Sequence, residues 1–318
     1  MKKPKDKSTE SSGPKVVVFG GSGFLGSHVA DELTARGFDV TIYDLVPSPW
    51  LLPSQKMVVG NILDRENVIR TCVGADYVYN FAGLADIGQS RENPEATVQL
   101  NILGNVHALE GAKVSGAKRF VYASTVYIYS ESGSFYRASK QASERYVEIY
   151  SENSGLDFTI LRYGSLYGRR ADPRNTIHAF IEGALKEKTI HYQGTGNELR
   201  EYIHVEDAAT CSVDILSESY RNEHVLLTGH QALRVRDVMT MVAEMLGNGI
   251  ELRFESRDRE SHYNITPYIY KPRIGKKLVS NRFVDLGQGL LDCIHEVDEK
   301  LKSIHHPSSS VSGHTLTE

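Results

Sequence analysis

Cysteine is scarce in this chain of 318 residues: only Cys72, Cys211 and Cys293 occur, they lie far apart, and none belongs to a C-x-x-C pair. This spacing indicates neither a disulfide framework nor a zinc site, so we expect no bound metal and a reducing, cytoplasmic setting.

Long apolar runs are also missing. None approaches the ~20 residues that a membrane-spanning helix requires, and the mean hydropathy is −0.33. A net charge of −4 and a pI near 6.3 provide no basic surface, so we expect no nucleic acid and no membrane among the partners.

Neither end of the chain has the pattern of a folded element. Residues 1–14 are polar and contain several lysines but lack the apolar stretch of a signal peptide, and residues 303–318 are rich in serine and histidine. We predict a disordered tail at each end. The adjacent His305 and His306 could bind a metal ion, but a solvated pair explains them more simply. The length allows two domains or one large α/β unit.

Near its start the sequence has a cluster of glycines between an apolar run and a helical pattern. Residues 16–19 have the composition of a strand buried on both faces, and Gly20, Gly23 and Gly26 follow it. The apolar spacing of residues 24–35 predicts a helix there. A strand, a glycine turn and a helix N-terminus together bind anions. Free N–H groups and the helix dipole point at the ligand, and glycine lets a pyrophosphate approach the backbone. The alternative is a glycine-rich turn without a ligand.

A second predicted strand, residues 39–43, ends at Asp44, and this carboxylate indicates which dinucleotide would bind. It can accept hydrogen bonds from the hydroxyls of the adenosine ribose and would repel a 2′-phosphate. We therefore expect NAD rather than NADP as the cofactor. An exposed turn carboxylate is the alternative explanation of Asp44.

Strand and helix patterns alternate from residue 15 onward, as is typical of a parallel sheet with crossover helices. The predicted strands are residues 16–19, 40–43, 57–59, 77–82, 119–124 and 158–162, and the predicted helices include 24–35, 94–115 and 136–150. Beyond residue 168 the elements become shorter. We predict an α/β protein with a Rossmann-type, doubly wound parallel sheet and a smaller C-terminal α/β substrate domain. The expected boundaries are 15–170, with 196–217 returning, for an NAD-binding domain, and 171–195 with 218–302 for a substrate-binding domain.

Among the 17 tyrosines only Tyr136 has a lysine four residues later, Lys140. On a helix this spacing places both side chains on one face. An ammonium group beside a phenol favours the phenolate, so we expect the pKa of Tyr136 to fall toward working pH. Such a tyrosine could take a proton from a substrate hydroxyl while hydride leaves the same carbon. The pair follows a predicted strand that ends in Ser124 and Thr125, and sites in doubly wound sheets lie at such strand ends. An exposed helix pair is the alternative.

With these features the chain resembles the extended short-chain dehydrogenases/reductases, and within them the NAD-dependent epimerase/dehydratase family that acts on nucleotide sugars. The matches occur in family order over roughly residues 15–215. They are the glycine turn 20–26, Asp44, Asn61 and Ile62, residues 81–84, Asn101, Ser124 and Thr125, Tyr136 with Lys140, and the segments 161–163, 167–168 and 200–207. The series indicates the family but not the substrate.

The resemblance implies a role for each matching residue. Gly20, Gly23, Phe24, Leu25 and Gly26 would hold the pyrophosphate, Asp44 the adenosine ribose, Asn61 and Ile62 the adenine, and Phe81, Ala82 and Gly83 the path of the diphosphate. Lys140 would hold the nicotinamide ribose, and Tyr163 would lie near the nicotinamide. Thr125 would share the sugar hydroxyl with Tyr136, while Ser165 and Arg200 would contact the nucleoside-diphosphate sugar. Ser124 and Asn101 are expected behind these residues, His204 in the core and Asp207 as a helix cap.

Two departures from the family pattern narrow the expected chemistry. Dehydratases have an Asp-Glu pair after the catalytic threonine, and decarboxylating relatives keep the glutamate, whereas this chain has Val126 and Tyr127. The loop between Thr125 and Tyr136 is also shorter than in most relatives. We expect an epimerase that oxidises a sugar hydroxyl at C4 and reduces the ketone again. The alternatives are a dehydrogenase or reductase that releases its product, and a non-catalytic protein that senses a dinucleotide.

The resemblance also implies a homodimer in which the helices at 94–115 and 136–150 pair with those of a second copy. Leu100, Leu103 and Tyr146 would then lie in the interface. The alternative places these three side chains in the core of the monomer.

Overall fold

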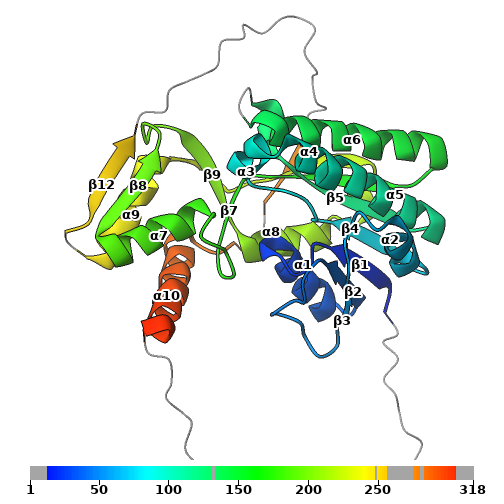
Figure 1. Cartoon of the computed structure of the whole chain (residues 1–318), viewed down its shortest axis with the longest axis horizontal. Coiled ribbons are helices and arrows are strands. Elements are labelled where there is room, and N and C mark those ends of the chain that lie inside the picture. The colour runs from blue at the N-terminus through cyan, green and yellow to red at the C-terminus, as the bar shows by residue number, and fades with distance from the viewer. Residues whose placement is uncertain (1–12, 131–132, 248, 256–274, 280–282, 306–318) are drawn as a thin grey trace, which may run out of the picture. The chain divides into compact units, whose positions relative to one another are not determined.

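The computed structural model describes residues 13–130, 133–247, 249–255, 275–279 and 283–305 (Figure 1). Within them the chain forms two compact units. The first holds the described residues of Met1–Leu166, Arg200–Ala232 and Glu260–Val284, and the second holds those of Tyr167–Leu199, Leu233–Arg259 and Asp285–Glu318. The residues predicted as disordered tails fall largely outside the described part of the chain.

A parallel sheet of eight strands forms the centre of the first unit, in the order β13-β10-β6-β5-β4-β1-β2-β3. Its strands are β1 (Lys15–Phe19), β2 (Asp39–Asp44), β3 (Lys56–Val59), β4 (Tyr77–Asn80), β5 (Arg119–Thr125), β6 (Phe158–Tyr163), β10 (Glu223–Leu227) and β13 (Lys276–Leu278). The direction of winding reverses at β1, which pairs in parallel with both β2 and β4. The C-terminal ends of these strands therefore form the crevice in which such sheets bind ligands. The predicted doubly wound parallel sheet is confirmed.

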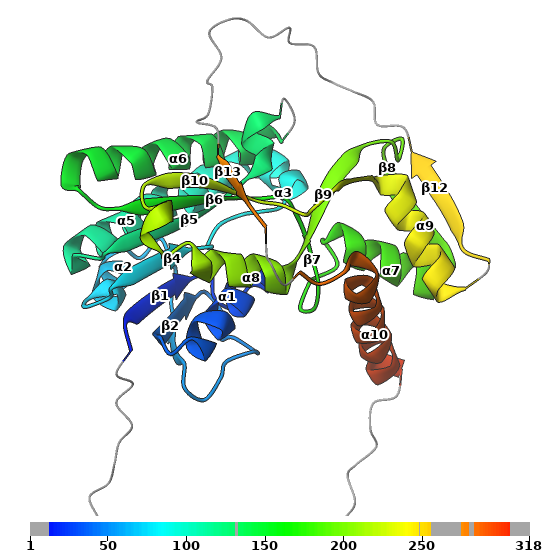
Figure 2. The same ribbon diagram turned by 180° about the vertical axis from the view of Figure 1, so that it is seen from behind.

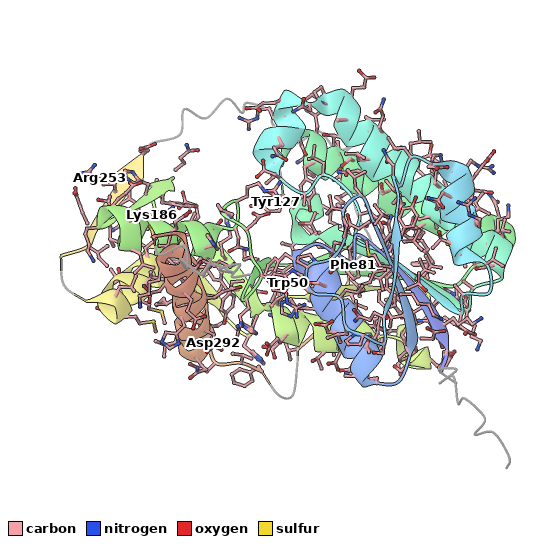
Figure 3. The ribbon with its side chains drawn as sticks, turned by 60° about the horizontal axis from the view of Figure 1, so that its bottom comes forward. Trp50, Phe81, Tyr127, Lys186, Arg253 and Asp292 are labelled. Atoms are coloured by element: carbon pink, nitrogen blue, oxygen red, sulfur yellow. The ribbon has the colours of Figure 1, made fainter. Side chains whose placement is uncertain are left out.

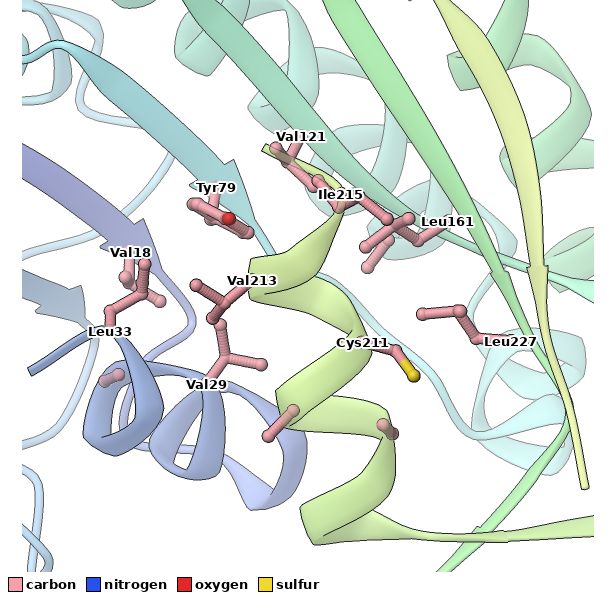
Figure 4. Packing of buried hydrophobic residues seen from close by; sticks show 14 of the residues in the cluster. Val18, Val29, Leu33, Tyr79, Val121, Leu161, Cys211, Val213, Ile215 and Leu227 are labelled. Carbon is pink, nitrogen blue, oxygen red and sulfur yellow. The ribbon is translucent and has the colours of Figure 1, made fainter. Parts of the chain in front are cut away.

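Helices cover both faces of this sheet. On one face α1 (Phe24–Ala35) packs against α8 (Val205–Asp214), and Figure 2 shows the two side by side. On the other face lie α2 (Arg65–Cys72), α5 (Gly104–Ser115) and α6 (Ser134–Ser154). Val18 belongs to the first core cluster with Val29 and Val213 (Figure 4), while its neighbour Phe19 belongs to the second cluster. Burial of alternate side chains on both faces explains the continuous apolar run of β1.

The chain between β4 and β5 differs from the single helix predicted at 94–115. It forms α3 (Ile87–Glu92), α4 (Pro94–Thr97), a π-helical stretch η1 (Val98–Leu103) and then α5. Asn101, 2% exposed, lies in the π-helical stretch. A π-turn adds a residue to one helical turn, which changes the direction of the side chains within it.

The second unit has helices and strands about as long as those of the first, contrary to the expectation of shorter elements beyond residue 168. Its elements are α7 (Thr176–Glu187), α9 (Val235–Leu246), α10 (Leu286–His305) and the parallel strands β8 (Thr189–Gln193) and β12 (Glu251–Glu255). A three-stranded sheet has the order β11-β9-β7, and its strands are β7 (Ser165–Tyr167), β9 (Leu199–His204) and β11 (Ala232–Arg234). Two short 3₁₀ turns, η2 (Val126–Tyr129) and η3 (Glu218–Tyr220), complete the described elements.

Three further findings concern cysteines, metals and membranes. Cys72, Cys211 and Cys293 are free and buried. No group of three potential metal-ligating side chains occurs among the residues that the structure describes. Over the same residues, no helix combines the length and the apolar composition needed to cross a bilayer.

Candidate active site

The glycine turn between β1 and α1 leaves no room for side chains. Gly20 has a φ of +76°, and a Cβ on it would lie 2.6 Å from the backbone nitrogen of Ala82. A Cβ on Gly26 would lie 2.2 Å from the carbonyl oxygen of Gly20. Gly23 is the N-cap of α1, which has no side-chain cap and no acidic residue in its first turn. The turn is thus a bare helix N-terminus, held close to strand β1, that suits a pyrophosphate.

Asp44 lies beside this turn. Its Oδ2 accepts a hydrogen bond from the backbone nitrogen of Ser22 at 2.9 Å, and its Oδ1 accepts one from Leu45 N at 2.7 Å. The carboxylate therefore stands at the end of β2, next to the glycine turn. The structure brings Asp44 and the glycines together as the sequence pattern predicts for a dinucleotide site.

The residues predicted to contact adenine follow the next strand, β3. The side-chain oxygen of Asn61 accepts from Leu63 N at 2.9 Å, and the Asn61 carbonyl accepts from the Tyr43 hydroxyl at 2.8 Å. The side chain of Ile62 is 7% exposed and belongs to the second core cluster. Asn61 and Ile62 thus lie in a well-anchored segment, and their contact with adenine stays a prediction.

The loop after β4 is held by Asn101. Phe81, labelled in Figure 3, stacks on Tyr79 with 5.9 Å between the ring centroids. Asn101 Oδ1 accepts from Leu84 N at 2.6 Å, and its Nδ2 donates to the Leu84 carbonyl at 3.0 Å and to Ser139 Oγ at 2.9 Å. A Cβ on Gly83 would lie 2.6 Å from Asn101 Oδ1. Asn101 therefore positions the loop of Phe81, Ala82 and Gly83 and connects it to α6.

Thr125 and Tyr136 come together at the end of β5. Thr125 is the last residue of β5, Tyr136 lies in the first turn of α6, and their side-chain hydroxyls form a hydrogen bond. Lys140, one helical turn later, is 6% exposed and donates from Nζ to the carbonyl of Ala123 at 2.8 Å. Its Nζ lies 5.8 Å from the centroid of the Tyr136 ring. The three predicted catalytic residues thus form one group.

The acidity of this group differs from the expectation. Burial raises the pKa of Tyr136 to about 12, although the hydrogen bond from Thr125 lowers it. Burial also lowers the pKa of Lys140 to about 8, against the opposing effect of the Glu144 carboxylate. The prediction that Lys140 lowers the pKa of Tyr136 is therefore wrong for the chain by itself. The physical reason is that desolvation of the phenol outweighs an ammonium group that is bonded to a backbone carbonyl.

A buried ion pair behind these residues was not predicted. Glu144 and Arg162 have fully buried side chains, with Arg162 Nη2 2.7 Å from Glu144 Oε2. Ser124 Oγ donates to Glu144 Oε1 at 2.5 Å. The spacing of four between Tyr136, Lys140 and Glu144, and an arginine within the apolar strand β6, were the available sequence signals.

Three other predicted site residues, Tyr163, Ser165 and Arg200, lie on strands that follow β5 in the chain. Tyr163 pairs in register with Thr125, but its hydroxyl lies 2.6 Å from Ser212 Oγ on α8, on the opposite face of the sheet from α6. Ser165 and Arg200 lie on the neighbouring strands β7 and β9, and both are half-buried. Their contacts with cofactor or substrate stay predictions.

At the start of α8 the roles of two residues differ from the expectation. The N-cap is His204, whose Nδ1 accepts from Glu206 N at 3.4 Å. Asp207 is not the cap, because it lies within the first turn of the helix that His204 caps. Its Oδ2 instead accepts a hydrogen bond from Val284 N at 2.9 Å. Burial raises the pKa of Asp207 to about 6.

Comparison with known proteins identifies the family to which the chain is similar. The family model described as "NAD dependent epimerase/dehydratase family" matches residues 16–227. Among curated proteins, a putative UDP-glucose 4-epimerase of Methanocaldococcus jannaschii is 27% identical over 73% of this chain and 82% of its own length. A dTDP-glucose 4,6-dehydratase of Streptomyces antibioticus is 28% identical over 78% of this chain and 82% of its own length.

Solved structures show the same fold. A UDP-glucose 4-epimerase from Thermotoga maritima, solved with UDP-glucose, matches with a TM-score of 0.77 and 24% identity over 90% of this chain and 99% of its own. A UDP-glucose 4-epimerase from Thermus thermophilus, solved in complex with NAD, matches with a TM-score of 0.75 and 25% identity over 89% and 99%.

Proposed function

Since the chain belongs to the NAD-dependent epimerase/dehydratase family, we propose that it is an epimerase that inverts C4 of a nucleoside-diphosphate sugar. The chain is an enzyme of this family, and its cofactor is NAD. The observation that carries the proposal is the hydrogen-bonded pair of Thr125 and Tyr136 at the end of β5, with the buried ammonium group of Lys140 beside it.

The glycine turn fits this cofactor, because a Cβ on Gly20 or Gly26 would collide with backbone atoms 2.6 and 2.2 Å away, so that glycine is needed for the tight turn before the N-terminus of α1. Gly20, Gly23, Phe24, Leu25 and Gly26 would hold the pyrophosphate through backbone N–H groups. Asp44 would bind the adenosine ribose, and Lys140 the nicotinamide ribose. When bound, NAD supplies the acceptor and then the donor of a hydride.

The chain itself handles a proton. Tyr136 takes the proton of the sugar hydroxyl as the C–H bond at the same carbon breaks, and it returns that proton when the bond forms again on the other face. Thr125 shares the hydrogen bond of the sugar hydroxyl. Burial disfavours the phenolate of Tyr136, so the positive charge of Lys140 must offset part of that cost during the reaction.

The residues after Thr125 favour simple oxidation and reduction over elimination of water. Val126 and Tyr127 begin the turn η2, and the backbone nitrogen of Tyr127 donates to Thr125 Oγ1 at 3.2 Å. Neither side chain is a carboxylic acid that could protonate a leaving hydroxyl or remove a carbon-bound proton. This supports an epimerase over the dehydratase activity that one of the relatives has in its name.

The proposed substrate is a UDP-sugar, supported by the names of the relatives in both comparisons. Ser165 and Arg200 are proposed to contact it. The test is to incubate the purified full chain with UDP-glucose, UDP-glucuronic acid and UDP-N-acetylglucosamine, each without added NAD, and to follow the C4 epimers by NMR. We expect repeated turnover of one sugar without net production of reduced cofactor. Tyr136→Phe should reduce kcat at least ~10²-fold, because it removes the proton acceptor.

The matched control is Tyr146→Phe, an exposed tyrosine on the same helix, which should keep wild-type kcat. One equivalent of a keto sugar, formed with one equivalent of reduced cofactor, would instead identify the dehydrogenase alternative. No conversion of any nucleotide sugar, or full activity of Tyr136→Phe, would contradict the proposal.

A further inference from the structure

Helix α6 carries a row of ionisable side chains at intervals of four residues, and the first three of them are Tyr136, Lys140 and Glu144. A spacing of four places them on one face of the helix. The first two belong to the proposed proton-transfer group. Glu144 is fully buried beneath them, and the proposed reaction as described above gives it no task. Ionised carboxylates are rarely buried without a reason, because removing them from water is costly.

Glu144 is held by three hydrogen bonds from two neighbouring strands. Its Oε1 accepts from Ser124 Oγ at 2.5 Å and from Arg162 Nε at 3.0 Å, and its Oε2 accepts from Arg162 Nη2 at 2.7 Å. Arg162 also donates to the hydroxyl of Tyr129 and lies 5.0 Å from the centroid of that ring. Tyr129 in turn accepts from Gly275 N at 3.1 Å. This two-pronged pairing fixes the position of the carboxylate.

The bond from Ser124 ties this carboxylate to the strand end that carries Thr125. Ser124 immediately precedes Thr125, and Lys140 Nζ donates to the carbonyl of the residue before Ser124. One face of α6 is therefore attached to the end of β5 through both Lys140 and Glu144. We infer that this attachment fixes the position of Tyr136 along α6 relative to Thr125 at the end of β5.

The charges around Lys140 come from few groups. On its own helix they are Tyr136 and Glu144, and on β5 the ring of Tyr122 lies 4.9 Å from Nζ. On β6, Arg162 pairs with Glu144, and on η2 the hydroxyl of Tyr129 accepts a hydrogen bond from Arg162. Among these groups Glu144 is the acidic one, and its effect opposes the fall in the pKa of Lys140 that burial causes. In the absence of this carboxylate, Lys140 would lose its proton at a lower pH.

We propose that Glu144 is a positioning residue that keeps Lys140 protonated and aligned with β5, so that Lys140 can stabilise the phenolate of Tyr136. The inference rests on the proposed function of Tyr136 and deepens it. A purely structural role for the Glu144–Arg162 pair is the alternative. These two roles of Glu144 predict different results. If Glu144 is a positioning residue, the charge of Lys140 depends on it; if its role is purely structural, the charge of Lys140 does not.

The experiment measures that charge directly. The full chain is labelled with ¹³C at lysine Cε, the Lys140 resonance is assigned with Lys140→Met, and its shift is followed from pH 6 to 10. For the wild type we expect a midpoint near 8. Glu144→Gln should lower the midpoint by about one unit, because it removes the anion and leaves Arg162 as an unbalanced cation. The alkaline limb of the kcat–pH profile should move down by the same amount.

Two further variants separate charge from packing. Ser124→Ala removes the hydrogen bond to Glu144 but keeps its charge, so the midpoint of Lys140 should stay at the wild-type value. The double variant Glu144→Gln/Arg162→Met removes both charges of the buried pair, so that Arg162 is not left as an unbalanced cation, and it is the safer one to fold. Its midpoint should lie between those of the wild type and of Glu144→Gln.

An unchanged Lys140 midpoint in Glu144→Gln, or in the double variant if the single one does not fold, would overturn the inference. A shifted midpoint without a shift in the kcat–pH profile would overturn it as well. Failure of the proposed function has a different result: the wild type itself would convert no nucleotide sugar, while the NMR titration could still be compared between variants.

Discussion

Two opposing influences act on the hydroxyl of Tyr136. Loss of water around the phenol raises its pKa to about 12, whereas the hydroxyl of Thr125 lowers it. The Nζ of Lys140 lies 5.8 Å from the ring centroid, and its ammonium group does not prevent this rise in the pKa. Spacing in the sequence identifies which side chains can meet on a helix, but their charge states depend on how completely the fold removes water. The position of this pair could therefore be predicted, and its acidity could not.

Gly20 provides a test of the glycine turn at the scale of a single residue. Its φ is +76°, and a Cβ would lie 2.6 Å from Ala82 N. Gly20→Ala should therefore destabilise the fold by more than ~2 kcal/mol and weaken NAD binding, because both the strained φ and the contact with the backbone add to the cost. Thermal unfolding and calorimetric titration with NAD measure the two effects.

Gly116 is the matched control for this substitution. It has a φ of +67°, and a Cβ on it would meet nothing within 4 Å. Gly116→Ala should cost about 1 kcal/mol from the left-handed backbone alone and should leave NAD affinity unchanged. Equal effects of the two substitutions on stability and NAD affinity would show that the close approach of Gly20 to the backbone of Ala82 is not important.

At the scale of the element, the π-helical stretch η1 is a feature that the apolar spacing of the sequence could not predict. The apolar spacing of residues 94–115 predicted one continuous helix, and the structure has a π-turn at Val98–Leu103. The reason is tertiary: Asn101 forms hydrogen bonds with Leu84 and Ser139, which belong to a loop and to another helix. A buried asparagine inside an apolar helical pattern was the only local indication. Glu144 and Arg162 escaped prediction for the same reason, because their partners are distant in the chain.

The start of α8 has a pH dependence that can be measured. The pKa of Asp207 is raised from 3.8 to about 6 by burial, so the folded chain binds this proton more tightly than the unfolded chain does. The resulting stabilisation is fully present below pH 3.8 and is lost as the pH rises through about 6. Above that pH the ionised carboxylate costs on the order of 2 kcal/mol.

Asp207→Asn should remove this cost and keep an oxygen for the N–H of Val284. We expect the variant to melt a few degrees higher than the wild type at pH 8, with the difference shrinking as the pH falls below 6 and disappearing only below 3.8. Glu206→Gln is the control, because it removes the same charge from an exposed neighbour and should change the melting temperature little at either pH. A destabilised Asp207→Asn at pH 8 would show that the ionised carboxylate makes a favourable contact.

At the scale of the whole molecule, the two units differed in how well they could be predicted. Alternating strand and helix patterns predict the doubly wound sheet, because each buried strand such as β1 or β5 is a nearly continuous apolar run. In the second unit, β8 and β12 bury few side chains: β12 alternates between exposed and half-buried side chains, and only Thr189 and Ile190 of β8 are buried. Such elements have little apolar periodicity, and no motif marks what they bind. The sequence therefore predicted the sheet of the first unit but not what the second unit binds.

The proposed homodimer makes a prediction for the complete molecule. Leu103 in η1 is 45% exposed and Tyr146 in α6 is 43% exposed, and these two elements contact each other. Leu100, by contrast, packs against the second core cluster of the monomer.

We expect light scattering to give twice the chain mass of 35.4 kDa. Leu103→Asp and Tyr146→Asp should each shift the protein toward the monomer with its melting temperature nearly kept, because a charge in an apolar interface must lose its water. Val73→Asp, at a residue 69% exposed at the end of α2, is the control that should stay dimeric. A monomeric wild type, or dimers that persist in both interface variants, would place the exposed side chains outside any interface between copies.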